Sequence, residues 1–465
     1  MKLSAVTAGI FIWGCLLSVG ACKKNGTSQT SAGGTTTPPV TVKVPTAHIN
    51  ITGTKQQVTM MGGDMERSAN AVQNATNTQQ IIQWAFADIP FNICRMQYDK
   101  NQEITEGVKN FAFYNGTVQS MKDIKAVNPS IKFFATMRSD YDGFNQGDTN
   151  NLPTWIYNRQ TQILNVPKYG KFLADYVEYM SQQGVPVSYI SSAKEWTGVV
   201  KPDSAVKVIS VMKAELQQRS IAVPEIIDPA AWGIGQGINY ISRILQLGQT
   251  AQVAGWCTHN YNPNETKTYI EYNAAVLSTG KPWYQDETNA GGGGRFTPAG
   301  INPPMENTID AYKEKVSIYN AGAAGEVFFE LWSRGVNAES RSIYFTNNGT
   351  GERRRAYYIM KEFATGAVDA WYIPVSFLNI SNVSGMAFKK ENQLMVVLLN
   401  ESSNTIGEFK LSFSNGTVKT AGKVQWTNNF ADTGGKVSLI TAEQGKGLTT
   451  AIAAKSITIF NISLL

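Results

Sequence analysis

Eight short apolar runs alternate with amphipathic stretches between residues 58 and 366 of this 465-residue chain. The runs are rich in branched and aromatic residues, which favour strands, and the stretches that follow carry apolar residues at helical spacing. The runs lie at 58–63, 91–96, 131–137, 187–195, 225–228, 253–259, 281–287 and 326–332. Strands that alternate with helices predict an α/β fold with a parallel sheet, and eight such units fit a (β/α)8 TIM barrel.

The pattern changes after Gly366. Strand-like runs at 386–388, 394–399, 409–413 and 456–460 are separated by Asn, Gly and Ser turns, with no long helical stretch between them. This pattern predicts an appended small antiparallel β-sandwich. We expect residues 45–56 to add an N-terminal strand to that sandwich, residues 57–367 to form the barrel, and residues 368–465 to form the rest of the sandwich.

The N-terminus has the features of a secretory signal. A short basic start is followed by an apolar stretch from Leu3 to Val19, and the small residues before Cys22 resemble a bacterial lipobox. The apolar stretch is too short and too rich in small residues for a good membrane span. We expect a signal peptide over residues 1–21, lipidation of Cys22 and a flexible tether over residues 22–44. The protein would then be lipid-anchored at the bacterial cell envelope, and an ordinary signal peptide or an uncleaved anchor is the alternative.

Charge and residue counts exclude several classes of function. The net charge is +6, with no basic block beyond Arg353–Arg355, which gives no argument for nucleic-acid binding. With only His48 and His259 in the chain, a multi-histidine metal site is not expected, nor is any cofactor. Two of the four cysteines lie in the signal and lipobox region. The other two, Cys94 and Cys257, lie inside apolar runs and are interpreted as core thiols rather than as a disulfide.

Polar residues close the predicted strands at the end where barrels of this kind carry their active sites. In chain order these residues are Asp64, Arg95, Arg138, Glu195, Asp228, His259 with Tyr261, Glu287 and Trp332. Glu195 and Glu287 close strands four and seven. Two carboxylates at one site can divide the duties of acid/base and nucleophile and split a glycosidic bond without a metal or a cofactor. The remaining residues, with Trp155 and Trp196 in the mouth loops, are expected to contact a sugar.

Two of these candidates have an open alternative. Strand alternation places Glu287 on the same face as Gln285 and places Asp286 on the other face. We choose Glu287 because a residue at a strand end can bend toward the barrel mouth, and Asp286 stays the alternative. Arg95 would be costly to bury without a partner, so an ion pair with Glu287 or Asp64 is as consistent with the sequence as a sugar contact.

Several segments together form a recognisable set: Gly62-Gly63, 169–184 leading to Lys194-Glu195, His259-Asn260-Tyr261, 283–287 and Trp332. With these segments the chain resembles glycoside hydrolase family 30, whose members include glucosylceramidase-like, β-1,6-glucanase and xylanase-like enzymes. The resemblance covers most of the chain after residue 21 and includes the β-sandwich built from both chain ends. It implies that Glu195 is the acid/base and Glu287 the nucleophile of a retaining β-glycosidase.

Lys194 departs from the pattern of that family, which commonly has Asn immediately before its acid/base glutamate, where the amide can bond the sugar 2-hydroxyl. A lysine here has three open interpretations. It can hold Glu195 ionised and weaken it as an acid, it can bind an anionic sugar, or it can mark a loss of activity.

Two functions remain open from the sequence. The first is an O-glycosyl hydrolase that cleaves a poly- or oligosaccharide by a two-glutamate double displacement. The second is a non-catalytic glycan-binding lipoprotein on the same barrel. In both cases we expect a carbohydrate partner, a membrane contact through the lipid only, and a monomer.

Overall fold

The computed structural model describes residues 43–465, apart from residues 67, 139–151, 196, 290–295, 298–301, 330, 334–337, 340–343, 348, 430–433, 436–437 and 441–444. The predicted signal peptide, Cys22 and nearly all of the tether lie outside the described residues, as does Trp196. Residues 44–465 form one compact unit. None of the helices described there is long and apolar enough to cross a membrane.

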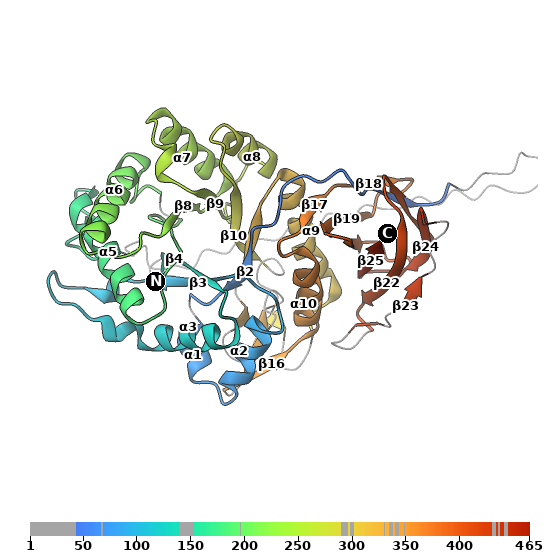
Figure 1. The fold of residues 1–465 in the computed structure, drawn as a ribbon, viewed down its shortest axis with the longest axis horizontal. Coiled ribbons are helices and arrows are strands. Elements are labelled where there is room, and N and C mark those ends of the chain that lie inside the picture. The colour runs from blue at the N-terminus through green and yellow to red at the C-terminus, as the bar shows by residue number, and fades with distance from the viewer. Residues whose placement is uncertain are drawn as a thin grey trace, which may run out of the picture. The chain divides into compact units, whose positions relative to one another are not determined.

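Eight parallel strands close into a barrel, which confirms the predicted fold class (Figure 1). In barrel order they are β2 (Met60–Asp64), β3 (Ile93–Tyr98), β4 (Lys132–Met137), β7 (Tyr189–Ile190), β8 (Glu225–Ala231), β9 (Gly255–Thr258), β10 (Trp283–Asn289) and β12 (Gly325–Phe329). Sequence order is kept around the barrel, and β12 closes it by pairing with β2. The carboxyl ends of all eight strands therefore meet at one end of the barrel.

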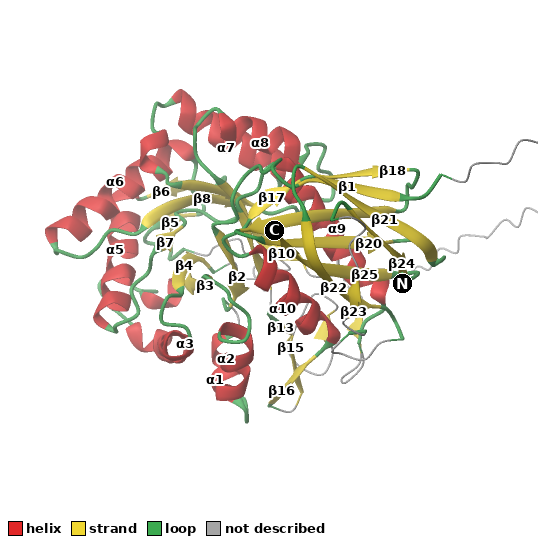
Figure 2. Cartoon of the chain, turned by 45° about the vertical axis from the view of Figure 1, so that its right-hand side comes forward, coloured by secondary structure: helices red, strands yellow, loops and turns green. Residues whose placement is uncertain are grey.

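Helices surround the barrel strands (Figure 2). They are α1 (Ala69–Gln73), α2 (Thr78–Phe86), α3 (Asn115–Val127), α5 (Val166–Gln182), α6 (Pro202–Gln218), α7 (Ile234–Gln246), α8 (Tyr269–Leu277), α9 (Met305–Ala321) and α10 (Arg355–Ala367). Caps locate several of their ends. The Asn165 side chain accepts a hydrogen bond from Lys168 N–H at the start of α5, and Thr268 and Glu271 form a capping box at α8.

The amphipathic stretch between the first two predicted strands, about residues 65–86, suggests one helix from its apolar spacing, but it does not form a single element. It is divided into α1 and α2 by residues 74–77. There the Asn77 side chain bonds both backbone polar groups of Gly351, accepting from its N–H at 2.7 Å and donating to its carbonyl at 3.0 Å. A tertiary contact thus replaces the intrahelical hydrogen bonds that the apolar periodicity favours.

Two predicted strands are shorter than the sequence suggests. Strand four was expected over residues 187–195, but β7 is only Tyr189–Ile190. The Ser191 N–H still donates to the Ala135 carbonyl of β4 at 2.9 Å, whereas the Ser192 N–H donates to the Asp228 side chain at 2.7 Å instead of to a neighbouring strand. Strand eight was expected to end at Trp332, but β12 ends at Phe329 and Trp332 begins a separate strand. The side chain of Trp332 lies outside the described structure.

Shorter elements connect the barrel units. They are the 3₁₀ helices η1 (Lys100–Gln102), η2 (Phe111–Tyr114) and η3 (Thr250–Gln252), and the strands β5 (Tyr157–Asn158), β6 (Ile163–Leu164), β11 (Phe296–Thr297), β13 (Trp332–Ser333), β14 (Ala338–Glu339), β15 (Tyr344–Asn347) and β16 (Thr350–Arg353). The pairs β5–β6 and β11–β14 are antiparallel, and β13, β15 and β16 form a three-stranded sheet.

The remaining strands form two sheets of a β-sandwich. One sheet has the order β18 (Val375–Leu378), β1 (Thr46–Asn50), β21 (Ile406–Ser414), β24 (Gly447–Ile452), and the other has the order β17 (Trp371–Ile373), β19 (Val383–Lys390), β20 (Gln393–Asn400), β25 (Ser456–Leu464), β22 (Val418–Trp426), β23 (Ser438–Ile440). One hydrophobic core contains side chains from both sheets. The N-terminal strand β1 pairs with β18 and β21, so both ends of the described chain lie in the sandwich.

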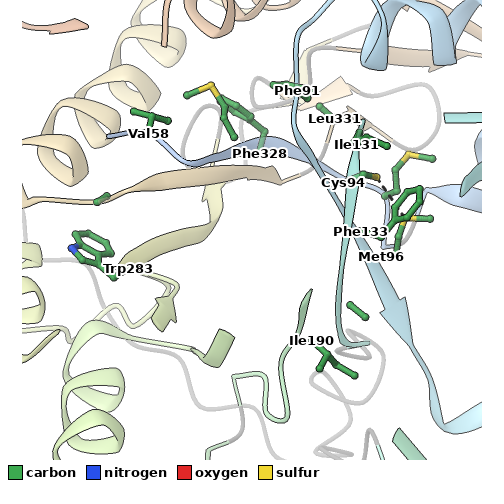
Figure 3. Close-up of a cluster of buried hydrophobic side chains, with 14 of the residues drawn as sticks. Val58, Phe91, Cys94, Met96, Ile131, Phe133, Ile190, Trp283, Phe328 and Leu331 are labelled. Carbon is green, nitrogen blue, oxygen red and sulfur yellow. Dashed lines mark hydrogen bonds between the residues drawn. The ribbon is translucent and has the colours of Figure 1, made fainter. Parts of the chain in front are cut away.

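Side-chain alternation along the barrel strands separates two further cores. In β3, Ile93 belongs to a small cluster inside the barrel, whereas Cys94 and Met96 belong to the large cluster between the strands and the helices (Figure 3). Cys257 lies in the inner cluster. The two cysteines are therefore buried in different layers, and both are free thiols, as predicted. The same alternation turns Arg95 toward the barrel interior, above Ile93.

We expect Gly62→Ala to destabilise the barrel strongly. A Cβ at Gly62 would lie 1.8 Å from the backbone oxygen of Ile93 on the paired strand, which cannot move without breaking the barrel. The increase in folding free energy should reach or exceed the roughly 1–3 kcal/mol typical of overpacking. Gly407→Ala is the matched control, because a Cβ there meets nothing within 4 Å. Urea denaturation of the two variants measures the difference, and equal stabilities would contradict the expectation.

Candidate active site

Arg95 is the centre of a buried cluster of charges at the carboxyl end of the barrel. Its Nε lies 2.5 Å from Asp64 Oδ2, its Nη1 lies 3.2 Å from Asp286 Oδ2, and its Nη2 lies 3.3 Å from Glu66 Oε2 and also contacts Glu287 Oε1. All five side chains are almost completely buried. A planar guanidinium with several fixed donors can bind several carboxylates at once, and this explains how one cation holds four acids.

Local irregularities bring these acids to the same place. Regular alternation would send Asp286 and Glu287 to opposite faces of β10, but the pairing of β10 with β12 shifts register between Gln285 and Thr288. The bulge lets both carboxylates reach Arg95. The Glu287 N–H also donates to the Gln285 side-chain oxygen at 2.8 Å, which fixes the backbone at this point.

Lys194 lies deep in the same cluster. Its ammonium donates to Glu66 Oε2 and lies 2.9 Å from Glu287 Oε1, and the side chain has no exposed surface. One interpretation from the sequence is that Lys194 holds Glu195 ionised, but in the structure its ion-pair partners are Glu66 and Glu287. Its charge acts mainly on Glu287 and Glu66, and Glu195 is only a minor contributor to its electrostatic surroundings.

Glu195 is held by an unusual backbone conformation. Its φ angle is 53°, its N–H donates to the Ala230 carbonyl at 2.7 Å, and it forms an isolated bridge with Ala231 at the end of β8. A non-glycine residue in this region costs free energy and persists only where surrounding contacts hold it. The Glu195 carboxylate then lies 3.3 Å from His259 Nδ1 and keeps a small exposed surface.

Asp228 holds the segment that leads to Glu195. Its carboxylate accepts hydrogen bonds from the Ser191 hydroxyl at 2.8 Å, from the Ser192 N–H at 2.7 Å and from the Ser192 hydroxyl at 2.6 Å. Three donors satisfy a buried carboxylate without a cation. These contacts hold the segment before Glu195 in place, and the sugar contact expected of Asp228 stays a prediction.

His259 connects the two candidate catalytic glutamates. One ring nitrogen of His259, one oxygen of Glu195 and one oxygen of Glu287 all lie within 4.8 Å of one another. His259 Nδ1 lies 3.6 Å from Glu287 Oε2, and its Nε2 lies 3.4 Å from Asp286 Oδ2, an ion-pair contact without hydrogen-bond geometry. The imidazole therefore faces three carboxylates at once.

The surrounding charges determine the ionisation of this cluster. Burial opposes ionisation of Glu287, but Arg95, His259 and Lys194 hold the pKa of its carboxyl well below the usual range. Burial would lower the pKa of His259, yet Glu287 and Asp286 raise it to about 10. The site therefore contains an ionised Glu287 beside a protonated imidazole at neutral pH.

Asp64 has the opposite shift. Burial raises the pKa of Asp64 to about 7 even with Arg95 beside it, because Glu66 and Glu287 share the same guanidinium and add negative charge. One acid of the cluster is therefore partly protonated near neutral pH, which reduces the repulsion among the carboxylates.

Glu195, His259 and Glu287 are ligand types that a divalent metal ion could use. Their neighbours do not suit one. Two cations, Arg95 and Lys194, already bind Glu287 Oε1 and would repel a divalent ion placed beside it. The charge distribution fits proton transfer and nucleophilic attack by carboxylates better than metal binding.

A cavity of about 770 Å³ opens beside Glu287. Gln285, Asn260 and Tyr261 line it near the barrel, and residues at the start of α8 and along the length of α9 line it farther out. Gln285 donates to the Tyr269 hydroxyl at 3.1 Å, and that hydroxyl donates to Glu314 at 2.8 Å, so polar groups continue from the site along the cavity wall. Its volume lies in the range of ligand clefts, roughly 300–1,000 Å³.

Other predicted site residues lie apart from the cluster. Arg138 contacts Asp99 Oδ2 at 3.2 Å, and the Trp155 indole donates to the Glu103 carbonyl at 2.9 Å while its ring packs near Phe172. Neither is among the described contacts of Arg95 or Glu287. Trp196 and the side chain of Trp332 lie outside what the structure describes.

Sequence reasoning missed Glu66. It lies two residues after Asp64, past the end of β2, where the chain no longer alternates as a strand. The available signal was the pair of acids Asp64 and Glu66 at one strand end, opposite an arginine at the end of the next strand. The sequence offers Asp286 only as an alternative to Glu287, whereas in the structure both carboxylates contact Arg95.

The shifted pKa of His259 predicts how stability depends on pH. A folded-state pKa of about 10 against 6.5 in the unfolded chain contributes stability that is complete below pH 6.5 and is lost as pH rises toward 10. Between these two pKa values the folded state binds one proton more than the unfolded state, so the free energy of unfolding should fall by about 1.4 kcal/mol per pH unit. Urea denaturation at pH 7.5 and 8.5 should show this loss in the wild type and not in His259→Asn. Equal slopes in both proteins would contradict the assignment.

No protein-family model matches the chain, and no curated protein matches it. Several solved structures match the chain in fold. A glycoside hydrolase family 30 subfamily 8 xylanase from Clostridium acetobutylicum is 17% identical, with a TM-score of 0.68 over 90% of this chain and 99% of that one. The catalytic domain of a family 30 xylanase from Talaromyces cellulolyticus is 14% identical (TM-score 0.66, covering 90% and 100%), and an endo-β1,6-glucanase is also 14% identical (TM-score 0.63, covering 90% and 94%). The chain thus has the fold of the family 30 glycoside hydrolases, as its sequence predicted.

Proposed function

We propose that this protein is a retaining β-glycosidase that hydrolyses a β-linked poly- or oligosaccharide. The observation that carries the proposal is the short distance between two carboxylates: one oxygen of Glu195 and one oxygen of Glu287 lie within 4.8 Å of each other. Retaining enzymes place their two carboxyl groups about 5–5.5 Å apart, whereas inverting enzymes leave about 6.5–9.5 Å for a water molecule. The names of the structural neighbours, xylanase and endo-β1,6-glucanase, support a β-glycan as the substrate class.

The surroundings of the two glutamates suit different duties. Glu287 is bound by Arg95 and Lys194, which keep it ionised as a nucleophile must be. Glu195 has contact with His259 and a small exposed surface, so it can exchange a proton with a leaving group and later with water. In the first step the anomeric carbon bonds to Glu287 as the glycosidic bond breaks, and Glu195 protonates the departing oxygen. In the second step Glu195 removes a proton from the water that replaces Glu287.

We expect Glu287→Gln to abolish turnover while leaving glycan binding largely intact, because the amide keeps the shape and removes the nucleophile. Glu195→Gln should lower the rate on polysaccharides by roughly 10²- to 10⁴-fold, the usual contribution of an acid/base group. Initial rates on β-xylan, β-1,6-glucan and a panel of 4-nitrophenyl β-glycosides measure both effects. Glu225→Gln, exposed at the opposite end of the barrel, is the control.

Azide rescue separates the two roles. In Glu287→Ala, azide should attack from the vacated face and give the α-glycosyl azide, whereas in Glu195→Ala it should attack the glycosyl-enzyme and give the β-glycosyl azide. Full activity in Glu287→Gln would move the nucleophile to Asp286. A wild-type protein that binds β-glycans and cleaves none of them would instead support the glycan-binding alternative.

We further propose that the protein is lipid-anchored at the bacterial cell envelope through Cys22, which the lipobox-like residues before it support. Expression in a bacterial host with radiolabelled palmitate should label the wild type and leave Cys22→Ala unlabelled. The variant should also move from the membrane fraction to the soluble fraction. Labelling of the variant would contradict the proposal.

A further inference from the structure

The two oxygens of Glu287 have different surroundings. Oε1 contacts Arg95 Nη2 and lies 2.9 Å from Lys194 Nζ. Oε2 has only the more distant His259 Nδ1, at 3.6 Å, among its described ion-pair contacts. The lone pairs of Oε1 are thus directed at two cations, and Oε2 is the oxygen that can attack a carbon atom. It also lies on the His259 side of the carboxylate, and His259 contacts Glu195.

Glu66 determines where the Lys194 ammonium lies. The Glu66 carboxylate contacts both Lys194 and Arg95, so it joins the two cations that bind Glu287 Oε1. A lysine side chain has many rotamers, and a buried partner restricts it to one. Without Glu66, Lys194 would be free to move toward Glu195 or the cavity.

We propose that Lys194, held by Glu66, is a positioning residue that fixes Glu287 Oε1 and leaves Oε2 as the attacking oxygen. This inference rests on the proposed retaining mechanism. It assigns a role within the reaction to the position where the family commonly has a neutral asparagine, and to Glu66, which sequence reasoning missed.

The charge of Lys194 affects the two chemical steps differently. In the first step the bond from Oε2 to the anomeric carbon forms, the bond to the leaving oxygen breaks, and Glu287 loses its negative charge, so Lys194 and Arg95 lose part of their attraction. In the second step water bonds to the anomeric carbon, the bond to Oε2 breaks, and the electron pair returns to Glu287. Lys194 stabilises that returning charge and therefore favours the second step.

The charged groups that face Glu287 come from every neighbouring element. The acids are Asp64 in β2, Glu66 just after β2, Glu195 after β7 and Asp286, which precedes Glu287 in β10. The cations are Arg95 in β3, Lys194 after β7 and His259 after β9. Removing Lys194 takes away one of three cations while every acid stays. The pKa of Glu287 should then rise, because Lys194 is one of the cations that lower it, and the acidic limb of the kcat/KM profile should move to higher pH.

Lys194→Met, which keeps the length of the side chain and removes its charge, is the test variant. With 2,4-dinitrophenyl β-xyloside or β-glucoside, whose leaving group needs little acid assistance, we expect kcat to fall roughly 10- to 100-fold. KM should fall with it, because the glycosyl-enzyme accumulates. Stopped-flow bursts and intact-protein mass spectrometry measure that accumulation. Lys194→Arg should restore part of kcat, and Glu66→Gln should show the Lys194→Met pattern more weakly.

Lys315→Met is the matched control. Lys315 forms another buried ion pair, 2.6 Å from Glu326, between α9 and β12 and away from the Arg95 cluster. Its loss should cost stability but change neither the burst nor the pH profile. If Lys194→Met and Lys315→Met behave alike, Lys194 is merely structural and the proposal is overturned. A change confined to the ratio of activities on uronic-acid-containing and neutral substrates would also overturn it and favour a direct sugar contact.

The same experiments separate the glycosidase activity of the protein from the role of Lys194. If the wild type cleaves no β-glycoside and Glu287→Ala shows no azide rescue, the glycosidase proposal itself is wrong. If both succeed and Lys194→Met keeps the wild-type burst and acidic limb, only the role of Lys194 is wrong. Should Lys194→Met fail to fold, the same burst and pH measurements on Lys194→Arg and Glu66→Gln decide the matter.

Discussion

The buried guanidinium of Arg95 is the interaction on which the site depends. A cation inside a barrel loses its hydration, and its burial is tolerated only if acids and hydrogen bonds replace the water. Asp64 and Glu66 supply two of those acids from the end of the neighbouring strand β2 and just after it. Asp286 and Glu287 supply the other two from β10, which lies two strands beyond β2 in the barrel. Removing a single partner from such a network typically costs about 3–5 kcal/mol. The same contacts that stabilise the top of the barrel therefore determine the ionisation of the proposed nucleophile.

Regular strand geometry alone would not assemble this cluster. The register shift in β10 lets two consecutive acids face one arginine, and the early end of β7 frees the chain to turn Lys194 and Glu195 into the same region. Glu195 itself has a φ angle of 53°. Each departure costs some stability locally, and all of them lie at the carboxyl end of the barrel. Concentration of such irregularities at one end is typical of a functional site.

The two proposed catalytic glutamates show how one charge distribution can separate two roles. Glu287 lies among cations and stays ionised, whereas the Glu195 carboxylate contacts His259 and reaches the surface. The imidazole, with its pKa raised to about 10, adds positive charge between them. The negative charge that moves through the proposed reaction thus meets groups that are already oriented, so little reorganisation is needed during the chemical steps.

The sequence by itself determined the barrel, the sandwich and the end of the barrel at which Glu195 and Glu287 lie, because hydrophobic periodicity and strand order are local properties that follow directly from the chain. It could not determine which acid pairs with which cation. Glu66 and Lys194 are 128 positions apart, the bulge at Asp286 and Glu287 arises from pairing with β12, and the break between α1 and α2 comes from the contact of Asn77 with Gly351. These features depend on non-local contacts and on burial, which only the tertiary structure decided.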